Sequence, residues 1–198
     1  MRTWSLLLVL GACSADIAPG TYFCGPEQLC PEGLTCDAVE DICTVPSQAG
    51  AFECEIPDRA GDDEPAAGLL LQPALDCVSG VRELKACLFA DDPGDWFQFS
   101  VPGNCTSAVQ IEARLTYPVA YEPVAMQLST DGAAPVAVDG ECKVAAGDAS
   151  GQTSRCFELV VENGSQHAIG LVHSETLNCG GACAFNRYTL NLQLSTAP

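Results

Sequence analysis

Cysteine offers the most reactive chemistry in this sequence, because 13 of its 198 residues are cysteines. In the cytosol so many thiols would indicate a metal-binding protein, whereas in an exported protein they would be oxidised to disulfides. Thirteen is an odd number, so at least one cysteine needs a fate other than pairing within the chain. The N-terminus and the spacing of the cysteines address both questions.

The N-terminus has the layout of an export signal. Arg2 precedes an apolar run of about nine residues, small residues follow the run, and Cys13 comes next. The run is far shorter than the roughly 20 residues needed to span a bilayer. We therefore expect residues 1–12 to be a cleaved leader. An ordinary secretory signal with a coincidental cysteine is the alternative.

The cleavage region, residues 10–13 (LGAC), resembles the lipobox of bacterial lipoproteins. In that family the cysteine thiol takes a diacylglyceryl group, the leader is cut before the cysteine, and the new amine is acylated. The resemblance implies that Cys13 is lipidated and that residues 13–19 are a lipidated tether. Two or three acyl chains would hold the protein on the membrane almost irreversibly. Because Ser14 and not an aspartate follows, the resemblance places the protein in the cell envelope at the outer membrane.

Residues 20–46 form a small module with four cysteines. Cys24, Cys30, Cys36 and Cys43 are separated by five, five and six residues, with Gly and Pro between them. So short a segment cannot bury enough apolar surface to fold alone, so we expect a loop-dominated module held by disulfides. Zinc is the rival, but its structural sites usually use closer cysteine pairs. Spacing does not determine the pairing, and we expect the alternating first-to-third, second-to-fourth arrangement.

Residues 47–68 are rich in Ala, Gly, Pro and acids and show no sustained period, which is typical of a linker. The run Asp62, Asp63, Glu64 could hold a metal ion. We prefer to interpret it as a solvated, self-repelling part of the linker.

Residues 69–198 have the alternating apolar and polar pattern of half-buried antiparallel strands. The segments that show it best are residues 95–101, 109–117, 124–128, 157–161 and 188–195. Turn residues such as Asp131-Gly132 and Asn163-Gly164 lie between them, and no helical stripe follows the leader. The pattern predicts an all-β fold, an antiparallel β-sandwich of jelly-roll type.

This region resembles the bacterial pre-peptidase C-terminal family, a β-sandwich found beside secreted peptidases and in surface lipoproteins. The resemblance rests on DWFQF at residues 95–99, FELVV at 157–161 and YTLNLQL at 188–194, and it covers roughly residues 60–196. Residues 121–123 (YEP) replace the aspartate-rich approach to the family's central strand, which weakens any inference of calcium binding. The extra cysteines are a second departure, one that suits an exposed, protease-rich setting.

Eight further cysteines would complete the disulfides once Cys13 is lipidated. They are Cys54, Cys77, Cys87, Cys105, Cys142, Cys156, Cys179 and Cys183. Their pairing is open, although a Cys142–Cys156 bond would clip a hairpin loop.

Catalytic chemistry finds little support in the sequence. His167 and His173 would face one side of a strand about 20 Å apart, too far to share one metal ion. No motif for a nucleophile, a zinc protease or a phosphate loop is present, and disulfides would consume the thiols. Asp91, Asp92 and Asp95 form an acidic loop that could coordinate Ca²⁺, but we prefer a solvent-facing turn. We expect no catalytic residue and no other cofactor.

Charge narrows the range of partners. The chain has 26 acidic and 8 basic side chains and a net charge of −18, which excludes nucleic-acid binding. We expect a non-enzymatic lipoprotein, attached to the membrane through its lipid, that presents a binding or structural β-sandwich to an extracellular or periplasmic protein or polysaccharide. The alternative is an accessory domain that assists a secreted hydrolase or peptidase by binding its substrate polymer. An enzyme with a carboxylate pair is a third possibility.

Overall fold

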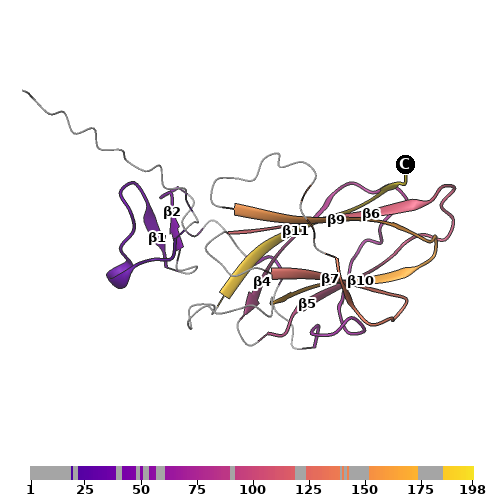
Figure 1. Ribbon diagram of the computed structural model, residues 1–198, viewed down its shortest axis with the longest axis horizontal. Helices are drawn as coiled ribbons and strands as arrows, with labels where there is room; N and C mark the ends of the chain where they lie inside the picture. The colour runs from indigo at the N-terminus through magenta and orange to yellow at the C-terminus, as the bar shows by residue number, and fades with distance from the viewer. Residues whose placement is uncertain are drawn as a thin grey trace, which may run out of the picture.

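The computed structural model describes residues 19, 22–38, 42–47, 50, 54–56, 61–89, 92–118, 124–138, 140, 142, 152–173 and 185–198. Two structured parts lie in these ranges: a small N-terminal hairpin and a larger β-sandwich beside it (Figure 1). Within them, no helix is long and apolar enough to cross a membrane.

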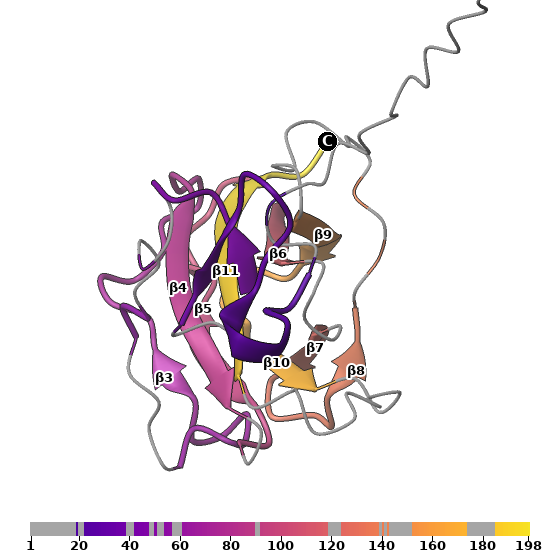
Figure 2. The same ribbon diagram turned by 90° about the vertical axis from the view of Figure 1, so that its left-hand side faces the viewer.

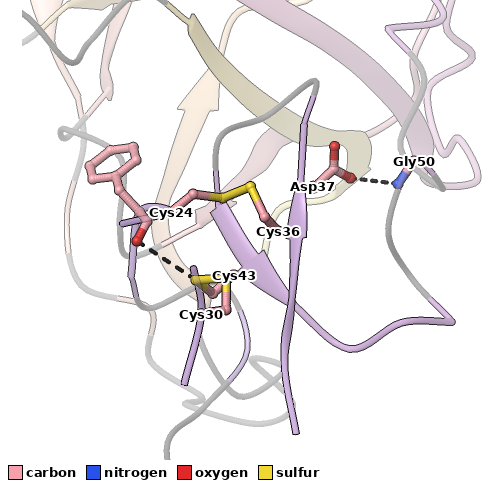
Figure 3. The surroundings of a disulfide bond; sticks show 7 residues. Cys24, Cys30, Cys36, Asp37, Cys43 and Gly50 are labelled. Carbon is pink, nitrogen blue, oxygen red and sulfur yellow. Dashed lines mark hydrogen bonds between the residues drawn. A yellow bond between two sulfur atoms is a disulfide. The ribbon is translucent and has the colours of Figure 1, made fainter. Parts of the chain in front are cut away.

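The N-terminal part is a disulfide-rich hairpin with little regular structure. A 3-10 turn, η1 (Pro26–Gln28), precedes the antiparallel strands β1 (Thr35–Asp37) and β2 (Ile42–Thr44). Two disulfides cross it, Cys24–Cys36 and Cys30–Cys43 (Figure 3). This is the alternating arrangement that we expected, and it places cystine sulfur where a larger domain would have an apolar core.

The remaining strands form two facing sheets. The five-stranded sheet has the order β3 (Leu69–Leu70), β5 (Asp95–Ser100), β10 (Gln166–His173), β7 (Val124–Thr130), β8 (Val136–Ala137). The four-stranded sheet has the order β4 (Arg82–Phe89), β11 (Phe185–Thr196), β6 (Val109–Pro118), β9 (Gln152–Val161). Figure 2 shows the two layers, with β3 and β8 at opposite edges of one sheet.

This strand order is that of a jelly roll. From β4 to β7 each strand lies in the other sheet from the one before, β8 pairs with β7 in the same sheet, and β9, β10 and β11 resume the alternation. All pairs are antiparallel except β3 with β5, which is parallel. The predicted all-β fold class is therefore confirmed.

The core lies between the sheets and comes from the alternation of each strand. In β6 the inward residues Ile111 and Leu115 are fully buried while their neighbours Glu112 and Arg114 face outward. Phe97 and Ile169 occupy the facing side from β5 and β10. Burial of such side chains contributes about 1.5–3 kcal/mol each and selects this register over one shifted by a residue.

Part of the region expected to be a linker is packed against the sandwich. A disulfide joins Cys54 to Cys87 of β4, and Ile56 makes a parallel bridge with Ala86. Farther along, Asp62 is buried and its carbonyl accepts the backbone N–H of Trp96. Composition could not indicate this packing, because the contacts are one disulfide and a few backbone hydrogen bonds and do not involve a periodic apolar face.

Candidate functional site

Ten of the predicted disulfide-forming cysteines are paired in the structure. Besides the two bonds of the hairpin there are Cys54–Cys87, Cys77–Cys105 and Cys142–Cys156. Cys13, Cys179 and Cys183 lie outside the described residues. The last pair is the one expected to clip a hairpin, and it lies beside the backbone bridge between Gly140 and Cys156.

Among the described residues, one set of three potential metal ligands has its donor atoms within 4.8 Å of one another. The three are Cys24, Cys30 and Cys43. All three sulfurs are already used in disulfides, so they cannot act as thiolate ligands. The hairpin is thus built on cystines and not on zinc.

The acidic loop is not the solvent-facing turn that we preferred. Asp92 and Asp95 are 7% and 4% exposed, and Asp62, expected in a solvated run, is 5% exposed. Asp91 lies outside the described residues. The three described carboxyl groups do not form a second close group of metal ligands. Calcium binding at this loop stays the alternative that the sequence left open.

A tyrosine from the opposite sheet meets these acids. The hydroxyl of Tyr188, in β11, donates a hydrogen bond of 2.6 Å to Asp95 Oδ2, in β5. Burial of the hydroxyl raises the pKa of Tyr188 well above 10.0, and the negative charges of Asp95, Asp92 and Asp62 raise it further. The hydroxyl therefore keeps its proton and can donate it to a carboxylate, a strong kind of hydrogen bond.

Sequence reasoning missed the pair of Tyr188 and Asp95, although one signal was present. Tyr188 shares parity with Leu190 and Leu192 on the inward face of the last strand. A buried tyrosine hydroxyl needs a hydrogen-bond partner. Which acid supplies it depends on the sheet order, because 93 residues separate the two.

His167 is the second titratable group with a defined environment. Ser165 Oγ lies 2.6 Å from the carbonyl oxygen of Glu162 and 2.7 Å from His167 Nε2. The carbonyl oxygen can only accept, so Ser165 donates its single proton there. His167 must then donate from Nε2 to Ser165, which leaves Nδ1 to accept from the Thr130 hydroxyl at 3.0 Å.

This arrangement makes His167 structural and not a general base. The unprotonated nitrogen faces Thr130 and not the serine, which is the reverse of what a Ser–His nucleophile needs. Burial lowers the pKa of His167 below 6.5, against the opposing effect of the Asp131 charge, so the ring is neutral at pH 7. Its bonds fasten the turn before β10 to the end of β7.

The outer face of the five-stranded sheet has a groove of about 730 Å³. Its floor includes the row Gln98, Ala168 and Ser129, which are cross-strand partners on β5, β10 and β7. In the next row Gly170 leaves room for the ring of Trp96, which would overlap a Cβ atom placed there. The small side chain of Ala168 thus leaves space between Gln98 and Ser129, whereas the Trp96 ring fills the space over Gly170.

Each wall of the groove is fastened by one residue of the floor. On the β3 side, Gln98 Nε2 donates to the carbonyl of Pro65 at 2.8 Å. On the β8 side, Ser129 Oγ donates to the carbonyl of Ala133 at 2.7 Å. The walls are therefore held in place without a ligand, as in most small-molecule and peptide sites.

The outer face of the four-stranded sheet has a smaller hollow, of about 380 Å³. Its side chains hydrogen-bond across the strands to one another. Gln193 and Ser195 donate to Glu112, Gln110 donates to Glu158, and Thr116 bonds Ser154. Since these groups already satisfy one another, the groove on the other sheet is the better candidate for a binding site.

No protein-family model and no curated protein matches the chain. Among solved structures, the pre-peptidase C-terminal domain of a collagenase from Bacillus anthracis is similar at 14% identity and a TM-score of 0.39, over 70% of this chain and 100% of that one. A periplasmic inhibitor of g-type lysozyme from Salmonella Typhimurium is similar at 11% identity and a TM-score of 0.38, over 65% of this chain and 99% of that one.

A β-(1,4)-mannanase with a CBM35 module from Podospora anserina is similar at 15% identity and a TM-score of 0.30, over 64% of this chain and 27% of that one. At TM-scores this low the similarities carry no argument about function. Membership of the pre-peptidase C-terminal family stays a prediction.

Replacing Tyr188→Phe is expected to lower the free energy of unfolding by about 1–3 kcal/mol, because Asp95 stays buried without the hydroxyl. Denaturant titration measures the change. Tyr117→Phe is the matched control, since Tyr117 is also buried in the core and its hydroxyl makes no hydrogen bond within the described part of the chain. Equal losses of unfolding free energy in the two variants would show that the hydrogen bond from Tyr188 to Asp95 does not contribute to stability.

The pKa of His167 predicts a pH dependence of stability. Because the pKa is lowered in the folded state, the unfolded chain takes up a proton more readily as the pH falls below 6.5, and the free energy of unfolding decreases. His167→Gln should reduce this slope between about pH 6.5 and pH 5. His173→Gln controls for loss of a histidine as such. An unchanged slope in His167→Gln would count against the assignment.

Proposed function

We propose that this chain is a non-catalytic binding module of the cell envelope, attached to the membrane by lipid on Cys13, and that it binds its ligand in the groove over the five-stranded sheet. The observation that supports the site is the concave floor of Gln98, Ala168 and Ser129 between two fastened walls. A volume of about 730 Å³ lies within the usual range of ligand sites.

The described titratable groups support binding over catalysis. Tyr188 and Asp95 are sealed in the core, where no substrate reaches them. In the Ser165–His167 pair, the histidine Nε2 donates to the serine and so cannot accept the serine's proton, as a nucleophile would require. Both residues are also buried. In the groove, the polar groups of Gln98 and Ser129 are suited to hydrogen bonding and not to acid–base work.

Filling the groove tests the site. Ala168→Trp places a large ring on its floor and should abolish binding of whichever probe the wild type retains. The probes are isolated peptidoglycan, neutral glucan oligosaccharides and a library of random peptides, and binding is measured by sedimentation or calorimetry. Asn191→Trp is the matched control, because it adds the same ring to the outer face of the four-stranded sheet. Equal effects of both variants would contradict the groove as the site.

The membrane attachment has its own test. Cys13→Ser removes the thiol that would carry the lipid, and the protein should move from the membrane fraction to the soluble fraction. Mass spectrometry of the wild-type N-terminus should find an acylated cysteine. An unmodified N-terminus at residue 13, or unchanged membrane association of the variant, would exclude the lipid anchor.

A further inference from the structure

The described cationic side chains are confined to one of the two sheets. Arg82 and Lys85 lie on β4, Arg114 on β6, Arg155 on β9 and Arg187 on β11, all in the four-stranded sheet. The five-stranded sheet and its connections, over residues 61–79, 92–108, 124–138 and 162–173, contain no Lys or Arg. The sandwich thus has one sheet with all the described positive charges and one with none.

Acidic side chains remain exposed around the five-stranded sheet. Asp63 and Glu64 are exposed before β3, and Glu64 lines the groove. Asp131 is exposed at the end of β7, and Glu162 is exposed before β10. With no described cation nearby to compensate them, these carboxylates give this face a negative potential, which a groove concentrates.

We propose that the groove binds a basic, extended segment of a partner protein, an inference that rests on the proposed function and names the ligand class for the same site. Charge complementarity favours Lys and Arg side chains at its mouth. A neutral glycan would gain nothing from this potential, and an acidic polymer would be repelled by it.

The hydrogen-bonding groups of the floor suit a polypeptide backbone. Gln98 uses one N–H of its carboxamide for Pro65, so its second N–H and its carbonyl oxygen can bond a peptide. Ser129 is 3% exposed and its hydroxyl holds Ala133, so Gln98 is the hydrogen-bonding side chain of the floor row that a peptide can reach. Leu70 and Pro135 add apolar area along the walls for the aliphatic stems of basic side chains.

Among the described residues, the lining also lacks what a sugar-binding site would use. The two rings among its residues, Phe99 and His167, are buried, stacked on one another with centroids 5.5 Å apart, and have little surface for a sugar ring. The floor is three strands wide, which is about 10 Å between β5 and β7. That width admits one extended chain lying along the strands.

Calorimetry with defined probes on the full chain, purified in detergent, tests this inference. The probes are a peptide of about 12 residues in which Lys and Ala alternate, the same peptide with Glu or Ser in place of Lys, and a neutral glucan hexasaccharide. We expect the Lys peptide alone to bind and its affinity to fall as ionic strength rises from about 0.05 M to about 0.5 M.

Glu64→Lys reverses the charge on the groove wall and should weaken binding of the Lys peptide by about fivefold or more. Its matched control is Glu83→Lys, which changes the net charge equally on the four-stranded sheet and should leave the affinity unchanged. Both positions are exposed, so the variants are expected to fold, and thermal unfolding verifies that they do.

The outcomes separate this inference from the proposed function. One outcome is that the glucan or the Ser peptide binds the wild type but not the Ala168→Trp variant, while the Lys peptide does not bind. In that case the groove is a binding site, but the proposal of a basic ligand is wrong. If the Lys peptide binds with no difference between Glu64→Lys and Glu83→Lys, the attraction comes from net charge and the inference fails. If no probe binds, the proposed function fails with it.

Discussion

The hydrogen bond from Tyr188 to Asp95 is the polar contact on which the packing of the two sheets depends. It joins β11 to β5 across the space between the sheets, at the end where Asp62 and Asp92 are also buried. A carboxylate taken out of water costs several kcal/mol unless it is hydrogen-bonded, so the neutral hydroxyl offsets part of a large penalty. Because β5 also carries Gln98, a fixed position for Asp95 helps to fix the floor of the groove and the wall that Gln98 holds.

Much of the fold could be predicted because the strands are amphipathic with a period of two. Val109 to Tyr117 and Tyr188 to Leu194 alternate without a break, and their inward residues are those buried between the sheets. What could not be predicted is how residues 54–56 and 61–68 pack, because they have no periodic apolar face. A disulfide and backbone hydrogen bonds hold them, and both depend on partners far away in the sequence.

The candidate site was less accessible to sequence reasoning than the fold. The floor residues Gln98, Ala168 and Ser129 occur in three separate strands, and nothing marks them until the jelly-roll order makes them neighbours. His167 was expected to have no catalytic function, but its bonds to Thr130 and Ser165 arise only when the end of β7 lies beside the turn before β10. The acidic loop shows the limit of composition most clearly, because Asp92 and Asp95 are buried although a run of acids usually faces solvent.

The confinement of the described cations to one sheet gives the sandwich an electric dipole moment directed across its two layers. In the field of an anionic phospholipid surface such a dipole experiences a torque, and the favoured orientation turns the four-stranded layer toward the lipid headgroups. The effect acts within roughly one Debye length, about 8 Å at physiological ionic strength. A molecule tethered at such a surface would therefore hold its concave layer outward, toward the aqueous compartment.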